Sequence, residues 1–109
     1  MSQLEKIISE IIKFRDDRDW KQFHNGKDLA LAISIEAAEL NQLFLWKTSE
    51  EVDTEKVKDE LADVLNYSFL LAYKYGFNIE EIVLDKIAKN AVKYPIEKSK
   101  GNAKKYNEL

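Results

Sequence analysis

The stretch AISIEAAELNQLFLW, residues 32–46, is apolar along most of its length, yet it carries Glu36 and Glu39 three residues apart. A second stretch, DELADVLNYSFLLAY at 59–73, repeats the arrangement with Glu60 and Asp63. Residues at i and i+3 share one face of a helix. A buried ionised carboxylate is costly unless it is paired or binds a metal. The two stretches therefore predict two central helices, each with a pair of acids on an otherwise apolar surface.

The rest of the chain also has the pattern of helices. Only three glycines and one proline occur, and no segment keeps the alternation that is typical of a strand. Apolar spacing, cap residues and stop signals predict four helices, at about 3–17, 28–46, 54–75 and from 79 to just before Pro95. We expect an all-α, four-helix domain over residues 1–95, followed by a polar, basic C-terminal tail at 96–109.

The composition limits the class of protein. A chain of 109 residues suggests one domain, and 45% hydrophobic residues are typical of a globular chain. The absence of cysteine excludes disulfides and thiolate metal sites. The net charge of −3 argues against a general nucleic-acid binder, although KSKGNAKKY at 98–106 is a local basic exception. We see no signal peptide and no apolar run long enough to span a bilayer, so we expect a cytoplasmic location.

The second predicted helix is apolar on nearly every side. Its apolar residues are Leu29, Leu31, Ile33, Ile35, Leu40, Leu43, Phe44, Leu45 and Trp46. A helix of this kind is usually buried all round. We therefore expect a homo-oligomer, a dimer or tetramer, in which a second copy completes the core. The alternative is a central helix buried within one chain.

The two acid pairs predict a metal site. If their helices pack antiparallel, four carboxylates can face one crevice and form an all-oxygen site. Such ligands suit Mg²⁺, with Mn²⁺ as the alternative. Helical di-iron proteins use Glu-x-x-His pairs instead, and the single histidine, His24, does not follow a glutamate at that spacing. The alternative is that the acids form two solvated helix faces.

Several motifs resemble those of a known family. EAAEL followed by DELADV resembles the signature of the MazG-like, all-α nucleoside triphosphate pyrophosphohydrolases. Further segments are similar, in the same order, to the dCTP pyrophosphatase-like branch: DWKQFH (19–24), LFLWK (43–47), DVLNY (63–67), KIAKNAVKYP (86–95) and KKYNEL (104–109). The resemblance implies hydrolysis between the α and β phosphates to a monophosphate and pyrophosphate. It also implies a role in nucleotide-pool clean-up, with dCTP or modified dCTP as substrate.

The resemblance also implies the residues of the site. The expected metal ligands are Glu36, Glu39, Glu60 and Asp63, and Glu36 or Glu39 is the expected general base. The expected substrate-binding residues are Trp20, His24, Trp46, Tyr67, Lys86, Asn90, Lys93, Tyr94 and Lys105. The two tryptophans and His24 are expected around the base, Tyr67 beside the sugar, and the lysines near the phosphates.

Two other classes of function remain open from the residues alone. One is a non-catalytic helical scaffold or regulatory binding module, and the other is a nucleic-acid binder that uses the basic tail. The tryptophans can also be core residues, and the face made by Lys86, Asn90 and Lys93 can be solvated. Four acids repel phosphate unless a cation is present, so the acid pairs favour the metal-dependent enzyme.

Overall fold

The computed structural model describes residues 1–109, and its regular elements are helices alone. The elements are α1 (Gln3–Asp17), η1 (Lys21–Phe23), α2 (Gly26–Gln42), α3 (Thr54–Lys74), α4 (Ile79–Lys93), α5 (Ile96–Ser99) and η2 (Tyr106–Glu108), where η marks a 3₁₀ turn. The predicted all-α class is confirmed. The chain forms two compact units, Met1–Phe77 and Asn78–Leu109, which we describe separately. None of the helices combines the length and hydrophobicity that a membrane span requires.

Side chains cap the starts of the helices. At α1 the Glu5 N–H donates to the Ser2 hydroxyl, and the Ser2 N–H donates to the Glu5 carboxylate, which makes a capping box. At α4 the side-chain oxygen of Asn78 accepts from the Glu81 N–H at 2.9 Å. Both starts agree with the sequence-based prediction, because capping depends only on residues within one helical turn.

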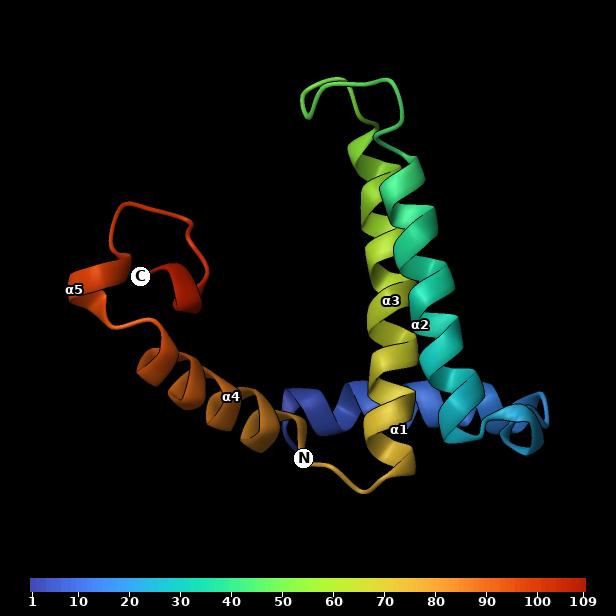
Figure 1. Ribbon diagram of the computed structural model, residues 1–109. Helices are drawn as coiled ribbons and strands as arrows, with labels where there is room; N and C mark the ends of the chain where they lie inside the picture. Colours follow the sequence, from blue (N-terminus) through green and yellow to red (C-terminus); the bar gives the residue numbers. More distant parts are fainter. The chain divides into compact units, whose positions relative to one another are not determined.

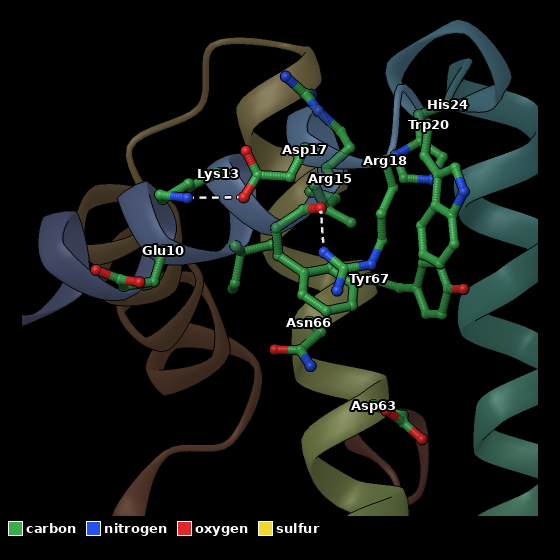
Figure 2. A pocket seen from close by; sticks show the side chains of 13 residues that line it. Glu10, Lys13, Arg15, Asp17, Arg18, Trp20, His24, Asp63, Asn66 and Tyr67 are labelled. Atoms are coloured by element: carbon green, nitrogen blue, oxygen red, sulfur yellow. Dashed lines mark hydrogen bonds and ion pairs between the residues drawn. The ribbon is translucent and has the colours of Figure 1, made fainter.

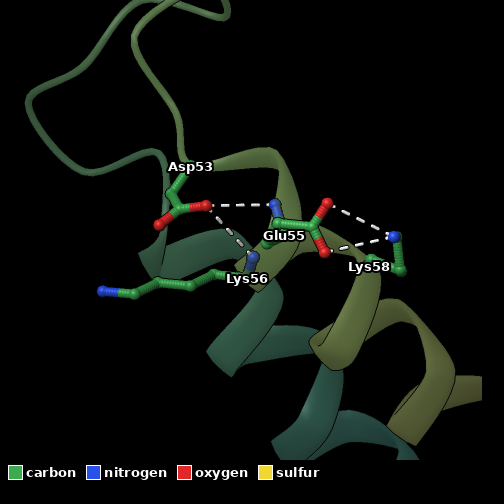
Figure 3. A network of polar contacts seen from close by, with 4 residues as sticks. All are labelled: Asp53, Glu55, Lys56 and Lys58. Atoms are coloured by element: carbon green, nitrogen blue, oxygen red, sulfur yellow. Dashed lines mark hydrogen bonds and ion pairs between the residues drawn. The ribbon is translucent and has the colours of Figure 1, made fainter.

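The start of α3 is held by Asp53 (Figure 3). Its carboxylate accepts from the backbone N–H groups of Glu55 at 3.0 Å and Lys56 at 3.4 Å. Glu55 also pairs with Lys58 at 3.1 Å. Both partners of that pair are well exposed, so the pair stabilises the helix little, whereas the cap satisfies backbone donors that lack helical partners.

In the first unit, α2 and α3 form an antiparallel hairpin, and they lie side by side along their lengths (Figure 1). α1 packs against α3 and crosses the hairpin at the end where α2 begins and α3 finishes. The buried apolar residues Leu29, Leu70 and Ala72 belong to this same end. Arg15 of α1 is also buried, and its guanidinium lies 5.8 Å from the ring centroid of Tyr73, which joins α1 to α3.

Helix α2 differs from the prediction in its end and in its burial. It finishes at Gln42 instead of Trp46, because the next N–H groups, from Leu43 onward, bond to carbonyls three residues back and the chain tightens into a turn. Trp46 then has a positive φ of 61°, which is incompatible with a right-handed helix. Within one chain the helix is not buried all round, since Leu31 and Ile35 remain 55% and 50% exposed.

The second unit has more structure than the predicted polar tail. After α4 the chain forms α5 and later η2. The Tyr106 ring packs edge-on against Tyr94 with centroids 6.2 Å apart, and the Lys93 ammonium lies 5.0 Å from the Tyr106 centroid. These contacts hold the C-terminal residues against the end of α4. The division predicted at residues 95 and 96 stays a prediction.

Candidate active site

Three of the predicted acids converge between α2 and α3. One carboxylate oxygen from each of Glu36, Glu60 and Asp63 lies within 4.8 Å of the other two. Glu36 comes from α2, and the other two come from adjacent turns of α3. The antiparallel packing of the two helices is what brings these acids to the same level of the hairpin.

The acid cluster lacks the partners that buried carboxylates usually have. The Oε2 atoms of Glu36 and Glu60 are buried and accept no hydrogen bond. None of the ion pairs of the chain includes an acid of the cluster. Buried polar atoms are nearly always satisfied, and a divalent cation with oxygen ligands would satisfy both of these atoms. The donor set therefore fits Mg²⁺ or Mn²⁺.

Burial and like charges shift the titration of the cluster. Burial raises the pKa of Glu36 to about 7, with Glu39 as the next cause and smaller contributions from Asp63 and Glu60. Burial also raises the pKa of Glu60, again with Glu39 as the next cause. Glu39 is itself exposed and lies outside the close triad, but its carboxylate is near enough to interact with both neighbours. The fourth predicted acid thus lies at the edge of the cluster.

A cavity of about 740 Å³ opens beside this cluster, between α1 and α3 (Figure 2). Its lining residues are Glu10, Ile11, Lys13, Phe14, Arg15, Asp17, Arg18, Trp20, His24, Asp63, Asn66, Tyr67 and Leu70. Asp63 belongs to both the acid cluster and the cavity wall. The predicted residues Trp20, His24 and Tyr67 line the same space, which is large enough for a small organic ligand.

The end of α1 brings Trp20 into this wall. Asp19 has a positive φ of 56°, its N–H donates to the Asp16 carbonyl, and the Trp20 N–H donates to the Arg15 carbonyl. This is the Schellman pattern that reverses a chain after a helix. Trp20 consequently packs edge-on against Phe14, with ring centroids 5.8 Å apart.

His24 presents a neutral ring to the cavity. Burial lowers the pKa of His24, and the nearby Arg15 charge lowers it further. Its Nδ1 atom is buried without a partner, and its ring lies edge-on to Tyr67 at 6.5 Å. A neutral imidazole can both donate and accept, so His24 suits the recognition of a polar heterocycle.

Sequence comparison identifies the family of this helical chain. Residues 31–109 match the MazG-like family. The chain belongs to the MazG-like family. It is 36% identical to dCTP pyrophosphatase 1 of Bos taurus and 35% identical to that of Homo sapiens, over 97% of this chain and 68% and 67% of those proteins. It is also similar to a crystal structure of a pyrophosphatase from Archaeoglobus fulgidus, with a TM-score of 0.81 and 37% identity over 87% of this chain and 94% of that one.

The comparisons confirm several predictions made from the motifs. The MazG-like family and the dCTP pyrophosphatase-like branch are both confirmed. The enzyme class, a nucleoside triphosphate pyrophosphohydrolase, is confirmed as well. The comparisons do not test the individual site residues of this MazG-like chain, and the roles of these residues stay predictions.

The structure does not bring the two predicted tryptophans together within one chain. Trp20 precedes the first turn of α2, and Trp46 follows its last turn, so they flank opposite ends of a 17-residue helix. Trp46 is 93% exposed. Of the two tryptophans, a single copy of this MazG-like chain therefore contributes only Trp20 to the cavity.

The five remaining predicted residues belong to the second unit. They are Lys86, Asn90, Lys93, Tyr94 and Lys105. The first three share one face of α4 by their spacing, and Tyr94 follows the last residue of that helix. The role of these residues in binding phosphate stays a prediction.

The sequence-based prediction named four of the thirteen lining residues and missed nine, among them Phe14, Arg15, Arg18 and Asn66. One signal could have revealed a pair of them. Phe14 and Arg18 are four residues apart near the end of the first predicted helix, a spacing that places an aromatic ring and a cation on one face. Asn66 carries no comparable signal, because its place in the wall depends on how α1 crosses α3.

Proposed function

We propose that this MazG-like enzyme hydrolyses deoxynucleoside triphosphates to a monophosphate and pyrophosphate with Mg²⁺, and that it prefers dCTP or a modified dCTP. The observation that carries the proposal is an acid cluster with two unsatisfied buried oxygens, next to a cavity lined by aromatic side chains. The dCTP pyrophosphatases among its relatives support the choice of base. A role in clearing unwanted nucleotides follows from such chemistry.

Glu36, Glu39, Glu60 and Asp63 would hold the cation. When bound, Mg²⁺ or Mn²⁺ supplies positive charge for phosphate oxygens and acidifies a nearby water. The carboxylates themselves provide the negative charge and hard oxygen atoms that such an ion requires. Without a cation, four acids would repel a triphosphate.

We assign proton transfer to Glu36 or Glu39. A general base works best when its pKa is close to the working pH. Glu36 meets this condition in the metal-free chain, since burial raises its pKa to about 7. Its neighbour Glu39 is exposed and can exchange protons with solvent. One of these two carboxylates, besides helping to hold the ion, would accept the proton of the attacking water.

The cavity would hold the nucleoside. Trp20 offers a flat aromatic face for the base, and His24 offers a neutral ring nitrogen that has no partner in the chain. Tyr67 follows Asp63 by one helical turn, which suits a side chain beside the sugar. The phosphates would be bound by residues of the second unit, Lys86, Asn90, Lys93, Tyr94 and Lys105, where each lysine acts as a point charge.

We further propose that the chain works as a homo-oligomer. Apolar side chains on α2 and α3 remain about half exposed in one chain, among them Leu31, Ile35, Leu61 and Leu65. A second copy would cover them, and it could also bring a Trp46 to the base of a neighbouring site. Light scattering should give at least twice the chain mass of 12.7 kDa. If only 12.7 kDa particles are present at micromolar concentration, this part of the proposal is excluded.

The test of the reaction is a panel of nucleoside triphosphates incubated with Mg²⁺, with products separated by ion-exchange chromatography. We expect monophosphate and pyrophosphate, fastest from dCTP or a modified dCTP, and no reaction in EDTA. Diphosphate and phosphate as products would show cleavage at the β–γ position and contradict the proposal. The same panel with Mn²⁺ identifies which ion supports the faster rate.

A further inference from the structure

Arg18 is the one arginine at the end of α1 that has no carboxylate partner. Each of the three aspartates near it is engaged elsewhere. The contacts are Asp16 with Arg15 at 2.8 Å, Asp17 with Lys13 at 2.7 Å, and Asp19 with Gln22 at 3.0 Å. Arg18 therefore forms no ion pair with its sequence neighbours.

Two contacts with Phe14 orient the Arg18 side chain. Its Cζ atom lies 3.6 Å from the centroid of the Phe14 ring, and its Nη1 donates to the Phe14 carbonyl at 3.0 Å. The centroid of the Trp20 ring lies 6.0 Å from the same Cζ atom. A planar, weakly hydrated guanidinium stacks well on aromatic faces. One of its five N–H groups is used, so four are free to bind a ligand.

The oriented guanidinium lies in the cavity wall (Figure 2). Figure 2 shows Arg18 with Asn66 and then Asp63 beyond it along α3. The aromatic residues around it are flat and largely apolar, as a nucleobase requires. Asp63, which belongs to the acid cluster, marks the side of the cavity where phosphate is expected.

We propose that Arg18 is a specificity-determining residue that donates two N–H groups to the O2 and N3 atoms of cytosine. This inference rests on the proposed function. The rigid fork of a guanidinium matches two adjacent acceptors, and cytosine has such a pair. Uracil and thymine carry an N–H at position 3, so a donor would face a donor. Arg18 thereby favours dCTP over dUTP and dTTP.

The test compares kcat/KM on dCTP, dUTP and dATP for the wild type, Arg18→Ala and Arg18→Lys, each with Mg²⁺. Losing a pair of charge-assisted hydrogen bonds should lower kcat/KM on dCTP by about ten- to a hundredfold. The loss on dUTP should be much smaller, so the ratio of dCTP to dUTP activity falls about tenfold or more. Arg18→Lys should not restore the ratio, because lysine is a point charge without a fork.

The matched control is Lys21→Ala, which removes an exposed cation of η1 outside the cavity wall and should leave the ratio unchanged. Arg18 is exposed, so its removal opens no core, and thermal unfolding of each variant verifies this. An equal loss on every nucleotide would assign Arg18 to phosphate and overturn the inference, as would unchanged kinetics. An active wild type with no preference for dCTP over dUTP overturns it too. A wild type inactive on all nucleotides with either cation rejects the proposed function itself.

Discussion

Two groups of helical carboxylates in the first unit have opposite surroundings. At the end of α1, Asp16 and Asp17 each have a cation within 2.8 Å. Between α2 and α3, Glu36 and Glu60 have only other acids beside them. The pKa of Asp17 is lowered by its hydrogen bond to Lys13, whereas the pKa of Glu36 is raised. The same residue types are thus paired with cations in one place and crowded with like charges in the other, as expected of a site that receives a cation.

The largest effect should come from removing one acid of the cluster. Glu36→Gln and Asp63→Asn each remove negative charge from the expected cation site, so we expect kcat to fall by about a thousandfold or more, equal to several kcal/mol. The control is Glu55→Gln, an exposed acid of α3 that is paired with Lys58. It should keep wild-type kinetics in the same product assay. Near-normal turnover by either cluster variant would separate the cluster from the reaction.

Adding Mg²⁺ should stabilise the wild type. An ion that binds only the folded chain adds about 2.7 kcal/mol of unfolding free energy at a hundred times its Kd. Thermal unfolding with EDTA and with millimolar Mg²⁺ measures this difference. In Asp63→Asn the shift should be largely lost. A wild type whose melting temperature is the same in both conditions would contradict a cation site at the cluster.

Removing one acid in EDTA should change the unfolding free energy in opposite directions at the two places, the end of α1 and the cluster between α2 and α3. Asp16→Ala deprives the buried Arg15 guanidinium of its partner, so we expect a loss of about 1–3 kcal/mol. Asp63→Asn relieves repulsion of Glu36, so the variant should be as stable as the wild type or more so. Urea unfolding at pH 7.5 measures both. A strongly destabilised Asp63→Asn would indicate that the cluster is structural.

The pH dependence of stability should also distinguish the acid cluster from the paired aspartates at the end of α1. Glu36 has a pKa of about 7 in the folded chain against an ordinary value of 4.5, so the folded state binds more protons between these values. Its stabilising contribution is complete below pH 4.5 and is lost as the pH rises through 7. Relative to Glu36→Gln, the wild type in EDTA should therefore weaken over this range. His24, whose pKa is lowered, acts in the opposite direction below its ordinary 6.5, but it is present in both proteins and cancels.

Parallel unfolding curves for the wild type and Glu36→Gln between pH 5 and 7.5 would contradict this account. The paired Asp17 supplies a contrast. Its lowered pKa gives a contribution that is present above its ordinary 3.8 and disappears as the pH falls further. Asp17→Asn should therefore change stability at neutral pH and lose its effect in acid, the reverse of Glu36→Gln.

The smallest effects on the unfolding free energy are expected at the start of α3, where a helix cap can be compared with an ion pair. Asp53→Ala removes the acceptor for two backbone donors, so we expect a loss of about 1 kcal/mol. Lys58→Ala breaks only an exposed pair and should change the unfolding free energy by less than about 0.5 kcal/mol. Urea midpoints of the two variants give both values. Equal effects would mean that Asp53 acts through surface charge instead of as a cap.

The local features of the fold were predictable. The first helix begins and ends where its capping box and apolar spacing place it, and the third differs by one residue at its end. The second begins at Gly26, two residues before the predicted start, and ends four residues before the predicted end. The end was misplaced because LFLW at 43–46 continues the apolar pattern, although N–H groups in this stretch bond three residues back. Hydrophobicity alone does not distinguish a helix from the turn that follows it.

The amino-acid sequence by itself determined the helices, their caps and the pairing of acids within each helix, since these depend on neighbours three or four residues apart. It also determined the MazG-like family through its motifs. Only the tertiary structure decided that Glu36 of α2 meets Glu60 and Asp63 of α3, because this depends on how two helices align. The chain reversal after α1 and the packing of α1 on α3 likewise placed Arg18 in a cavity with Asn66, and the length of α2 separated Trp20 from Trp46. Those positions arise from long-range packing, which no short sequence pattern encodes.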